Sequence, residues 1–334
     1  MTSLISVIIP CLNEEKFIAK CLDSIISQDF PKEKLEVFLV DGMSLDKTRD
    51  IIKSYEQKYP FIKILDNPKK FTPFALNAGI KQSKGEVIIR MDAHAVYENN
   101  YISKCVKHLE ESKADNVGGI LKTTALDETT MAKAIVISLS HFFGAGGSRF
   151  RLGAKEPKEV DTVFGGCYKR EVFDKIGFYN ENLIRSQDME FNLRLKKSGG
   201  KIMLFPDIVS YYYPKATLLE FFRHNVADGI WAVYPLKFVK MPFSLRHYLP
   251  LFFLLSLIGS AFLSLIVPPF YILFAFIFWT YFWANIFVSL FIAIKEKNIK
   301  LFFFLPFVFG ARHFGYGIGS LGGTIELLVP NLKR

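Results

Sequence analysis

Cysteine is scarce in this sequence: four of the 334 residues are cysteines, and no two of them form a C-x-x-C pair. Each lies within or beside an apolar segment, which is typical of a reduced thiol in a protein core. A structural zinc site and a disulfide framework are therefore not expected, and a cytosolic compartment is favoured. The four residues are Cys11, Cys21, Cys105 and Cys167.

The glycine-rich phosphate-binding motifs are also missing. No G-x-G-x-x-G follows the first predicted strand and the chain has no P-loop, which disfavours dinucleotide oxidoreductases and ATPases. Residues 1–10 lack a basic start and a long apolar run. They are therefore predicted to form a strand and not a signal peptide.

The sequence has no zinc knuckle, RNP-like motif or basic helix, although its net charge is +10. A positive charge of this size suits nucleic acid, a membrane surface or an anionic substrate. Because the nucleic-acid motifs are missing and the C-terminal part is apolar, we expect a membrane partner and no nucleic acid.

Charge is missing from a long apolar region near the C-terminus. This region contains two stretches, 248–267 and 270–294, and a bilayer span needs about twenty such residues. Arg246 precedes the first stretch and Lys295 follows the second. Positive residues on both outer flanks predict a multi-pass hairpin in the cell membrane. Its flanks and the N-terminal part of the chain are expected in the cytoplasm, with the Pro-Pro turn at 268–269 outside.

The chain is predicted to divide into three parts: an α/β domain at 1–215, an amphipathic interfacial connector at 216–247, and a transmembrane region at 248–334. Within the last part, residues 301–329 have two interpretations. Arg312 interrupts the apolar run, and charge is costly in mid-membrane. The segment is therefore either a third span or a set of interfacial or re-entrant pieces. Its glycines suit close helix packing; they are at positions 310, 315, 317, 319, 322 and 323.

Apolar β-branched runs alternate with amphipathic helical patterns in the first hundred residues. This β-α-β-α-β-α-β order predicts an α/β fold with a mostly parallel, doubly wound, Rossmann-like sheet. Asn13 precedes the first helical stripe and is predicted to cap that helix. Strands are predicted at 4–10, 36–40, 61–65, 86–92 and 116–122, and helices from 13, from 46, at 74–82 and at 98–112.

Two of the predicted strands end in a carboxylate, namely Asp41 and Asp92. Because α/β folds bind ligands at the carboxyl edge of the sheet, both acids are expected at the ligand site. A third acid, Asp188, occurs later in the chain. Together the three predict a nucleotide and metal site beside a base.

Six short segments stand out: S-V-I-I-P-C-L-N-E-E (6–15), V-D-G-M-S-L-D-K-T (40–48), N-A-G (77–79), D-A-H (92–94), F-G-G-C-Y-K-R (164–170) and Q-D-M-E (187–190). In this order they resemble the family 2 glycosyltransferases, which have a GT-A fold. The resemblance covers about residues 3–215, two thirds of the chain. The sequence R-M-D-A-H at 90–94 and the C-terminal segment 313–322 most resemble the corresponding segments of membrane-anchored enzymes of exopolysaccharide assembly, such as succinoglycan-type glucosyltransferases.

The resemblance implies a nucleotide-sugar donor, most readily a UDP-sugar, and a divalent cation that helps the diphosphate to leave. The cation would be Mg²⁺ or Mn²⁺. Asp92 matches the first acid of the family's D-x-D motif and is expected to bind the metal. His94 stands in place of the second acid, so it either binds the metal or contacts phosphate.

The same resemblance implies which residues bind the nucleotide. Asp41 is expected to contact the base or the ribose of the nucleotide. For Asn13, Glu15 and Asp46 the alternative is helix capping alone. The full nucleotide-sugar-binding set is predicted to be Pro10, Asn13, Glu15, Asp41, Ser44, Asp46, Asn77, Gly79, Asp92 and Ala93.

On the acceptor side, Asp188 matches the acid of the family's E-D motif, with Gln187 in place of the Glu. A sugar hydroxyl must lose its proton as it attacks, so Asp188 is expected to be the catalytic base of an inverting transfer. The alternative is an acid at a helix N-terminus. The predicted acceptor-side residues are Gly165, Gly166, Gln187, Arg223 and Trp231.

The resemblance implies a membrane-held acceptor, a polyprenyl diphosphate-linked saccharide, with a bare polyprenyl phosphate as the alternative. A degenerate scaffold that binds glycan or lipid without catalysis stays open, because His94 and Gln187 depart from the usual acids. The Q-x-x-R-W motif is missing, which argues against a processive polymerase. Residues 144–160 form a basic, glycine-containing loop. This loop is either a solvated connector or a cover over the substrate.

Overall fold

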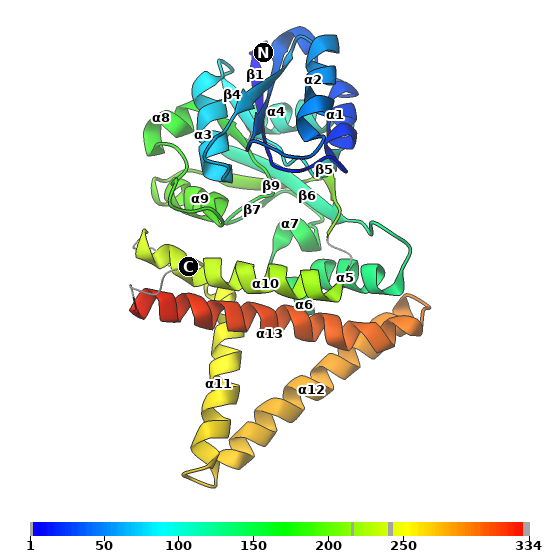
Figure 1. The fold of residues 1–334 in the computed structure, drawn as a ribbon, viewed down its shortest axis with the longest axis vertical. Helices are drawn as coiled ribbons and strands as arrows, with labels where there is room; N and C mark the ends of the chain where they lie inside the picture. Colours follow the sequence, from blue (N-terminus) through cyan, green and yellow to red (C-terminus); the bar gives the residue numbers. More distant parts are fainter. Residues whose placement is uncertain (1–2, 215–216, 240–242, 330–334) are drawn as a thin grey trace. The chain divides into compact units, whose positions relative to one another are not determined.

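The computed structural model describes residues 3–214, 217–239 and 243–329. It divides into two compact units, whose elements are labelled in Figure 1. The N-terminal unit comprises Met1–Lys122 and Ser148–Tyr213, and the C-terminal unit comprises Thr123–Gly147 and Pro214–Arg334. The division drawn from the sequence placed 123–147 in the α/β domain, whereas this segment packs here with the C-terminal helices.

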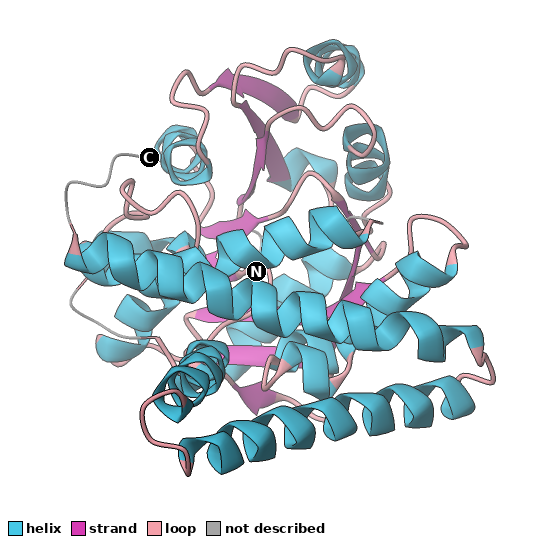
Figure 2. Cartoon of the chain, turned by 60° about the horizontal axis from the view of Figure 1, so that its bottom comes forward, coloured by secondary structure: helices cyan, strands magenta, loops and turns pink. Residues whose placement is uncertain are grey.

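One sheet runs through the N-terminal unit in the order β3-β2-β1-β4-β8-β6-β9-β5, with β7 paired to β9 (Figures 1 and 2). The run β3-β2-β1-β4 is parallel throughout. β8 pairs antiparallel with β4 and β6, and β9 pairs antiparallel with β5 and β7. The strands are β1 Ile5–Cys11, β2 Leu35–Asp41, β3 Ile62–Asp66, β4 Val87–Arg90, β5 Ala95–Tyr97, β6 Asn116–Thr123, β7 Lys158–Glu159, β8 Cys167–Lys169 and β9 Ile202–Tyr212.

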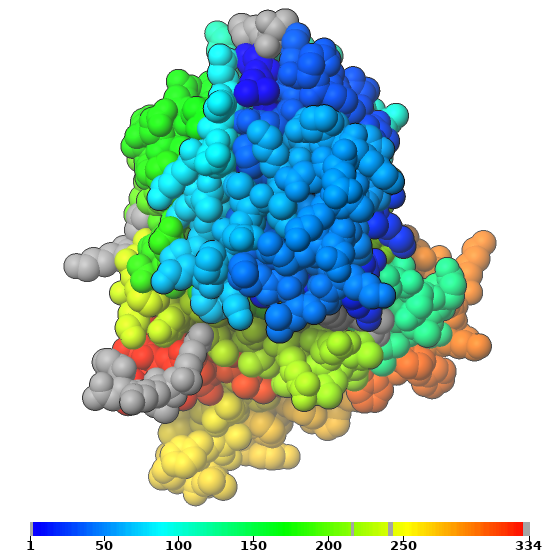
Figure 3. Space-filling view, turned by 45° about the horizontal axis from the view of Figure 1, so that its top comes forward, coloured from blue at the N-terminus to red at the C-terminus, as the bar shows by residue number. Residues whose placement is uncertain are grey.

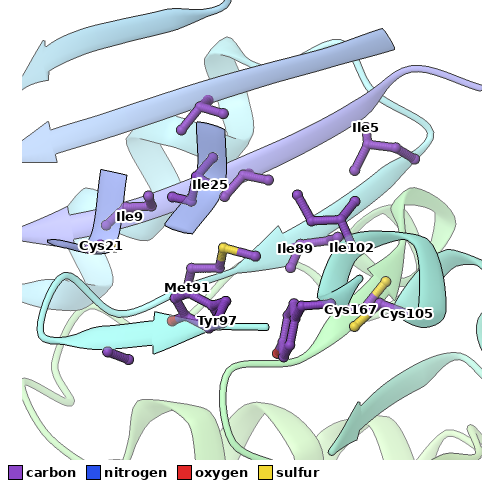
Figure 4. Packing of buried hydrophobic residues seen from close by; sticks show 14 of the residues in the cluster. Ile5, Ile9, Cys21, Ile25, Ile89, Met91, Tyr97, Ile102, Cys105 and Cys167 are labelled. Atoms are coloured by element: carbon purple, nitrogen blue, oxygen red, sulfur yellow. The ribbon is translucent and has the colours of Figure 1, made fainter. Parts of the chain in front are cut away.

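Helices cover the sheet on both faces, which explains why its parallel strands are apolar at successive positions. Ile5 and Ile9 point into one apolar cluster and Ile8 into another. Figure 4 shows the first cluster, in which Cys105 and Cys167 lie among apolar side chains. The helices of this unit are α1 Ile18–Ile26, α2 Thr48–Lys58, α3 Thr72–Gln82, α4 Tyr101–Ser112, α7 Arg149–Leu152, α8 Arg170–Ile176 and α9 Gln187–Lys197.

Two sequence-based details of this unit are corrected. Asn13 does not cap the first helix: its φ is 55°, and α1 begins only at Ile18, after Phe17. With this left-handed backbone conformation, Asn13 turns the chain toward the loop that follows β2. The Asn13 side chain accepts a hydrogen bond in that loop. Residues 144–160 are also not one irregular loop, because they include α7 and β7.

In the space-filling view of Figure 3, the blue N-terminal residues form one continuous surface.

The C-terminal unit is helical. Its helices are α5 Thr130–Ser140, α6 Phe142–Ala145, α10 Leu218–Val233, α11 Leu249–Ser264, α12 Phe270–Lys295 and α13 Lys300–Leu328. α10 and α13 run side by side (Figures 1 and 2). A Cβ built on Gly319 would lie 2.0 Å from the carbonyl oxygen of Val226, and one on Gly229 would lie 2.0 Å from that of Tyr316. Glycine is therefore required at this helix crossing, as the sequence predicted for Gly319.

The ambiguous segment 301–329 is one continuous helix, α13, whose polar side chains have partners within the unit. Arg312 donates from Nε to the carbonyl of Gly144 and from Nη1 to Asn225 Oδ1 over 3.1 Å. His313 Nε2 lies 2.8 Å from the carbonyl oxygen of Phe143. These contacts hold the 141–147 segment on α13 and explain its place in this unit.

Among the residues that the structure describes, two helices, α12 and α13, are long and apolar enough to cross a membrane. α11 is apolar but has only 16 residues, fewer than the first span predicted from the sequence. The long apolar C-terminal helices suggest that the protein is anchored to a membrane.

Candidate active site

The loop after β1 and the loop after β2 are joined by side chain–backbone hydrogen bonds. The N–H of Asn13 donates to Ser44 Oγ over 2.8 Å, and the N–H of Leu45 donates to Asn13 Oδ1 over 2.9 Å. Two acids continue the pattern: the N–H of Glu15 donates to Asp46 Oδ2 over 3.1 Å. Asn13, Glu15, Ser44 and Asp46 thus form one wall at the carboxyl edge of the parallel strands, where ligands bind in this class of fold.

Asp46 also contacts the start of α2, since the N–H of Thr48 donates to its Oδ1 over 3.0 Å. Hydrogen bonds from backbone N–H groups favour the charged carboxylate. Burial acts to raise the pKa of Asp46, but the hydrogen bond from the Thr48 hydroxyl, followed by those from the backbone N–H groups, outweighs it and lowers that pKa. The side chain is thus used structurally in this arrangement, and its nucleotide role stays a prediction.

Asp41 is fully buried at the end of β2. Its carboxylate accepts hydrogen bonds from Ser44 Oγ (2.5 Å) and from the N–H of Ser44 (3.0 Å), and it pairs with Arg49 Nη1 (2.7 Å). A direct contact between Asp41 and a nucleotide base would require Ser44 or Arg49 to move aside.

Asp92 lies in the turn that follows β4. Its Oδ1 is 3.2 Å from Arg90 Nη2, and its side chain is 15% exposed. The backbone N–H of Asp92 donates to the hydroxyl of Tyr97 over 2.6 Å, which fixes the turn. Among the residues described, no hydrogen bond reaches the second carboxylate oxygen, so Oδ2 is available to a ligand.

His94 is held from two sides. Its Nδ1 lies 3.1 Å from Glu14 Oε1, and its ring meets the Tyr212 ring edge-on at a centroid distance of 5.6 Å. Glu14 is fixed in turn, because its N–H donates to Thr48 Oγ1 over 2.7 Å. The imidazole is 38% exposed and therefore accessible.

Arg90 connects the two predicted halves of the site. Its Nη1 is 3.7 Å from Asp188 Oδ2, while Nη2 contacts Asp92. Burial acts to lower the pKa of Arg90, but the charges of Asp92 and Asp188 outweigh it and raise that pKa. Nε and Nη1 of Arg90 are buried and form no hydrogen bond with any residue that the structure describes. A buried cation with unused donors beside two acids is expected at a ligand site.

Asp188 and Gln187 form the start of α9. The Asp188 side chain is 32% exposed, whereas Gln187 is 5% exposed. Gln187 Oε1, like Nε and Nη1 of Arg90, is a buried polar atom without a hydrogen bond among the described residues. The structure therefore places Asp92 and Asp188 on either side of Arg90, although 96 positions separate them in the sequence (188 − 92).

The Gly165-Gly166 pair lies against the backbone of Arg90. The φ angles are 69° and 108°, in the region that favours glycine. The N–H of Arg90 donates to the Gly166 carbonyl over 2.9 Å, and a Cβ on Gly165 would lie 2.7 Å from the Arg90 oxygen. The close approach of the Arg90 chain is thus sufficient to require glycine at Gly165.

Several predicted donor residues have packing contacts instead. Asn77 donates from Nδ2 to the Tyr179 carbonyl and to Glu181 Oε1, both over 2.9 Å. A Cβ on Gly79 would lie 2.5 Å from Ile8 Cγ2, so this glycine lets α3 approach β1. Pro10 lies in the sheet and Ala93 is buried. A nucleotide role for these four residues stays a prediction.

Arg223 and Trp231 lie on α10 in the C-terminal unit. Arg223 is exposed, and Trp231 is buried with its ring edge-on to Tyr234 at 5.3 Å. Their acceptor-side role likewise stays a prediction.

The predicted metal ligands, Asp92 and His94, have few other metal-binding side chains near them. The described residues contain no group of three or more His, Cys, Asp or Glu that could hold a metal ion. Asp92 and His94, one carboxylate and one imidazole, fit a cation that takes its remaining oxygens from substrate phosphates, as Mg²⁺ and Mn²⁺ sites of phosphate chemistry do.

Three residues of this site were not assigned a role from the sequence: Glu14, Arg90 and Tyr212. Only Arg90 gave a signal, because a charged residue ends an otherwise apolar buried strand. The partners of Glu14 and Tyr212 come from distant parts of the chain.

The model of the Glycosyl transferase family 2 matches residues 6–177. The chain therefore belongs to the family 2 glycosyltransferases, and the predicted enzyme class is confirmed. The fold is also similar to that of the mannosyltransferase PcManGT from Pyrobaculum calidifontis in complex with GDP-Man and Mn²⁺, with a TM-score of 0.59. That likeness covers 98% of this chain and 88% of the other at 18% identity, and it supports the predicted GT-A fold.

Two relatives match over most of their length. One is the dolichyl N-acetyl-α-D-glucosaminyl phosphate 3-β-D-2,3-diacetamido-2,3-dideoxy-β-D-glucuronosyltransferase of Methanococcus voltae, which is 34% identical and covers 79% of this chain and 83% of its own. The other is the succinoglycan biosynthesis protein ExoA of Rhizobium meliloti (strain 1021), which is 30% identical and covers 73% of this chain and 74% of its own.

Proposed function

We propose that the protein transfers a sugar from a nucleotide-sugar donor to a lipid-linked saccharide, with inversion at the anomeric carbon. The observation that carries this proposal is the Asp92–Arg90–Asp188 arrangement, in which a donor-side acid and an acceptor-side acid flank one buried cation. The Methanococcus relative, whose name includes a dolichyl phosphate-linked sugar, supports the lipid-linked acceptor.

In the proposed reaction Asp188 is the general base. As the acceptor hydroxyl oxygen attacks the anomeric carbon, its proton passes to the Asp188 carboxylate. The bond from that carbon to the diphosphate oxygen breaks, and the nucleoside diphosphate leaves with the electron pair. A base on the side opposite the leaving group gives a single displacement, hence inversion.

Asp92 and His94 are the residues that would hold Mg²⁺ or Mn²⁺. Once bound, the cation supplies charge neutralisation for the departing diphosphate. The wall made by Asn13, Glu15 and Ser44 is proposed to receive the nucleotide, with a UDP-sugar as the first donor to test. A GDP-sugar belongs in the same screen, because the Pyrobaculum structure contains GDP-Man and Mn²⁺.

The proposal also places the enzyme in a cell membrane. The α11–α12 hairpin would cross the bilayer, and the N-terminal unit would face the cytoplasm. Arg246 and Lys295 flank the hairpin, and positive residues favour the cytoplasmic side. Nucleotide sugars are made in the cytoplasm and are too polar to cross a membrane, so the donor site must be there.

Incubation of the purified protein with radiolabelled nucleotide sugars, Mn²⁺ and lipid extracts tests the proposal. Label is expected in a lipid product whose mild-acid lability is that of a diphosphate linkage. A phosphate-linked product in which the transferred sugar is attached directly to the lipid phosphate would instead identify a polyprenyl-phosphate sugar synthase. Metal-independent binding of donor with neither transfer nor hydrolysis would favour a non-catalytic scaffold, for which the replacement of acids by His94 and Gln187 is the motivating observation.

A further inference from the structure

The contact between Glu14 and His94 joins two segments that are 80 residues apart in the sequence. Glu14 belongs to the loop after β1, and His94 to the turn after β4. The distance between Glu14 Oε1 and His94 Nδ1 is 3.1 Å, which is a normal hydrogen-bond length. The contact therefore sets the rotation of the imidazole ring relative to Asp92, two residues earlier on the same turn.

The chemistry of the contact also selects a tautomer. An ionised carboxylate only accepts hydrogen bonds, so Nδ1 must carry the proton that it shares with Glu14. In the neutral ring, the lone pair is then on Nε2. Carboxylate–histidine pairs of this kind are the usual outer partners of metal-binding histidines, because they fix the ring and raise its basicity.

Two further contacts make the arrangement rigid. The N–H of Glu14 is anchored on Thr48 Oγ1 over 2.7 Å, and the His94 ring rests edge-on against Tyr212. The Glu14 side chain is 20% exposed, so the carboxylate side of the contact is largely shielded from water, whereas the imidazole stays accessible. An incidental contact between two exposed side chains would have neither the hydrogen bond to Thr48 nor the ring contact with Tyr212.

We propose that Glu14 is a positioning residue, which fixes the ring of His94 and its tautomer, so that His94 would be ready to offer its Nε2 lone pair to the divalent cation that it and Asp92 would hold. The inference rests on the proposed metal-dependent function and extends it to a residue outside the D-x-H motif. It also accounts for a histidine in place of the second acid, because an imidazole oriented in this way serves as a neutral ligand.

The test is the affinity for Mn²⁺, measured by the free Mn²⁺ signal in electron paramagnetic resonance. The full-length protein in detergent is titrated with Mn²⁺ at saturating UDP, and again with GDP. Glu14→Ala is expected to weaken Mn²⁺ binding by about 10- to 100-fold, the range for loss of an outer partner. Glu14→Gln keeps an oxygen acceptor for Nδ1 and should weaken it less. Glu110→Gln, an exposed acid on α4, is the charge-matched control and should bind as the wild type does.

A double-mutant cycle separates positioning from a general loss of negative charge. If Glu14 acts through His94, Glu14→Ala should have no further effect on Mn²⁺ affinity in a His94→Ala background. Additive losses, or wild-type affinity in Glu14→Ala, would overturn the inference while leaving the proposed function intact. If the wild-type protein transfers sugar but binds no Mn²⁺ with either nucleotide, both the inference and the metal dependence of the proposed function are wrong.

Discussion

Arg90 Nη2 lies 3.2 Å from Asp92 Oδ1 at the end of β4, and the same guanidinium reaches Asp188 with its other terminal nitrogen at 3.7 Å. Both neighbours are predicted to act in the reaction, one on the donor side and one on the acceptor side. A single buried guanidinium therefore links the two acids.

Arg90→Met should destabilise the N-terminal unit, because it leaves Asp92 without its partner in a largely buried setting. Loss of one member of a buried pair costs about 3–5 kcal/mol, and these side chains are 10% and 15% exposed. A loss near the lower limit corresponds to a fall in Tm of roughly 6–12 °C, measured by circular dichroism. Arg90→Lys keeps the charge and should lose less. A Met variant as stable as the wild type would show that the pair contributes nothing.

Asp188→Asn should leave donor binding nearly intact and reduce turnover by at least about a hundredfold, the effect expected for loss of a general base. Binding is measured by calorimetry and turnover by product formation. Weakened donor binding with turnover spared would mean that the base has been wrongly assigned.

Asp92→Asn should instead impair the binding of the nucleotide-sugar donor. A neutral amide is a poorer ligand for a hard divalent cation than a carboxylate. We therefore expect loss of metal-dependent turnover together with weaker donor binding in the presence of Mn²⁺. If this variant bound donor and Mn²⁺ as well as the wild type does, Asp92 would not be a metal ligand.

Gly319→Ala should weaken the α10–α13 crossing, because its Cβ would lie 2.0 Å from the Val226 oxygen. Overpacking of this kind costs about 1–3 kcal/mol. Trp231 on α10 can report the change through its fluorescence during thermal unfolding in detergent. Gly322→Ala is the matched control: nothing lies within 4 Å of its Cβ, and alanine in a helix is neutral or stabilising by up to about 1 kcal/mol. Equal stability of the two variants would contradict the close packing.

The membrane topology is tested by cysteine labelling in intact cells. α11 has 16 residues and spans about 24 Å, so the apolar turn after it must complete the crossing of a core of about 30 Å. Val267→Cys should react with an impermeant thiol reagent added outside, and Lys297→Cys only after lysis. The opposite result would reverse the orientation, and lack of reaction at both sites before lysis would show that the hairpin does not cross.

The native cysteines allow this experiment in an otherwise unmodified chain. All four are buried. Burial, followed by the nearby Asp41 carboxylate, raises the pKa of the Cys11 thiol, and burial likewise raises the pKa of Cys21 and Cys167. Thiolates are the reactive form, so little background labelling is expected at neutral pH.

The strand ends could be predicted from the sequence because they depend on local information. An apolar β-branched run that stops at Asp41 marks both the strand β2 and the edge of the sheet. The run before Asp92 marks β4 in the same way, although β4 ends at Arg90 and Asp92 lies in the turn after it. The same holds for four glycines of α13, at positions 315, 317, 319 and 323, where a Cβ would lie 3.1 Å or less from a backbone oxygen of another segment. The prediction was wrong for Gly310 and Gly322, because nothing lies within 4 Å of a Cβ built on either.

The remaining features depend on contacts between distant segments. Glu14 meets His94 across 80 residues, and Arg312 holds the Gly144 carbonyl across 168. Neither residue carries a local pattern that names its partner. For the same reason the segment 123–147 was predicted within the α/β domain, although Arg312 and His313 bind it to α13.

The anomeric configuration of the product tests the central claim most directly. The purified protein is supplied with Mn²⁺, a lipid-linked saccharide and the nucleotide sugar that it accepts, and the new linkage is read from the coupling constant of the anomeric proton by NMR. A base at Asp188 opposite the leaving group predicts a configuration inverted relative to the donor, with product formation by Asp188→Asn at least about a hundredfold slower under the same conditions. Retention of the donor configuration, or full product from the Asp188→Asn variant, would contradict the account.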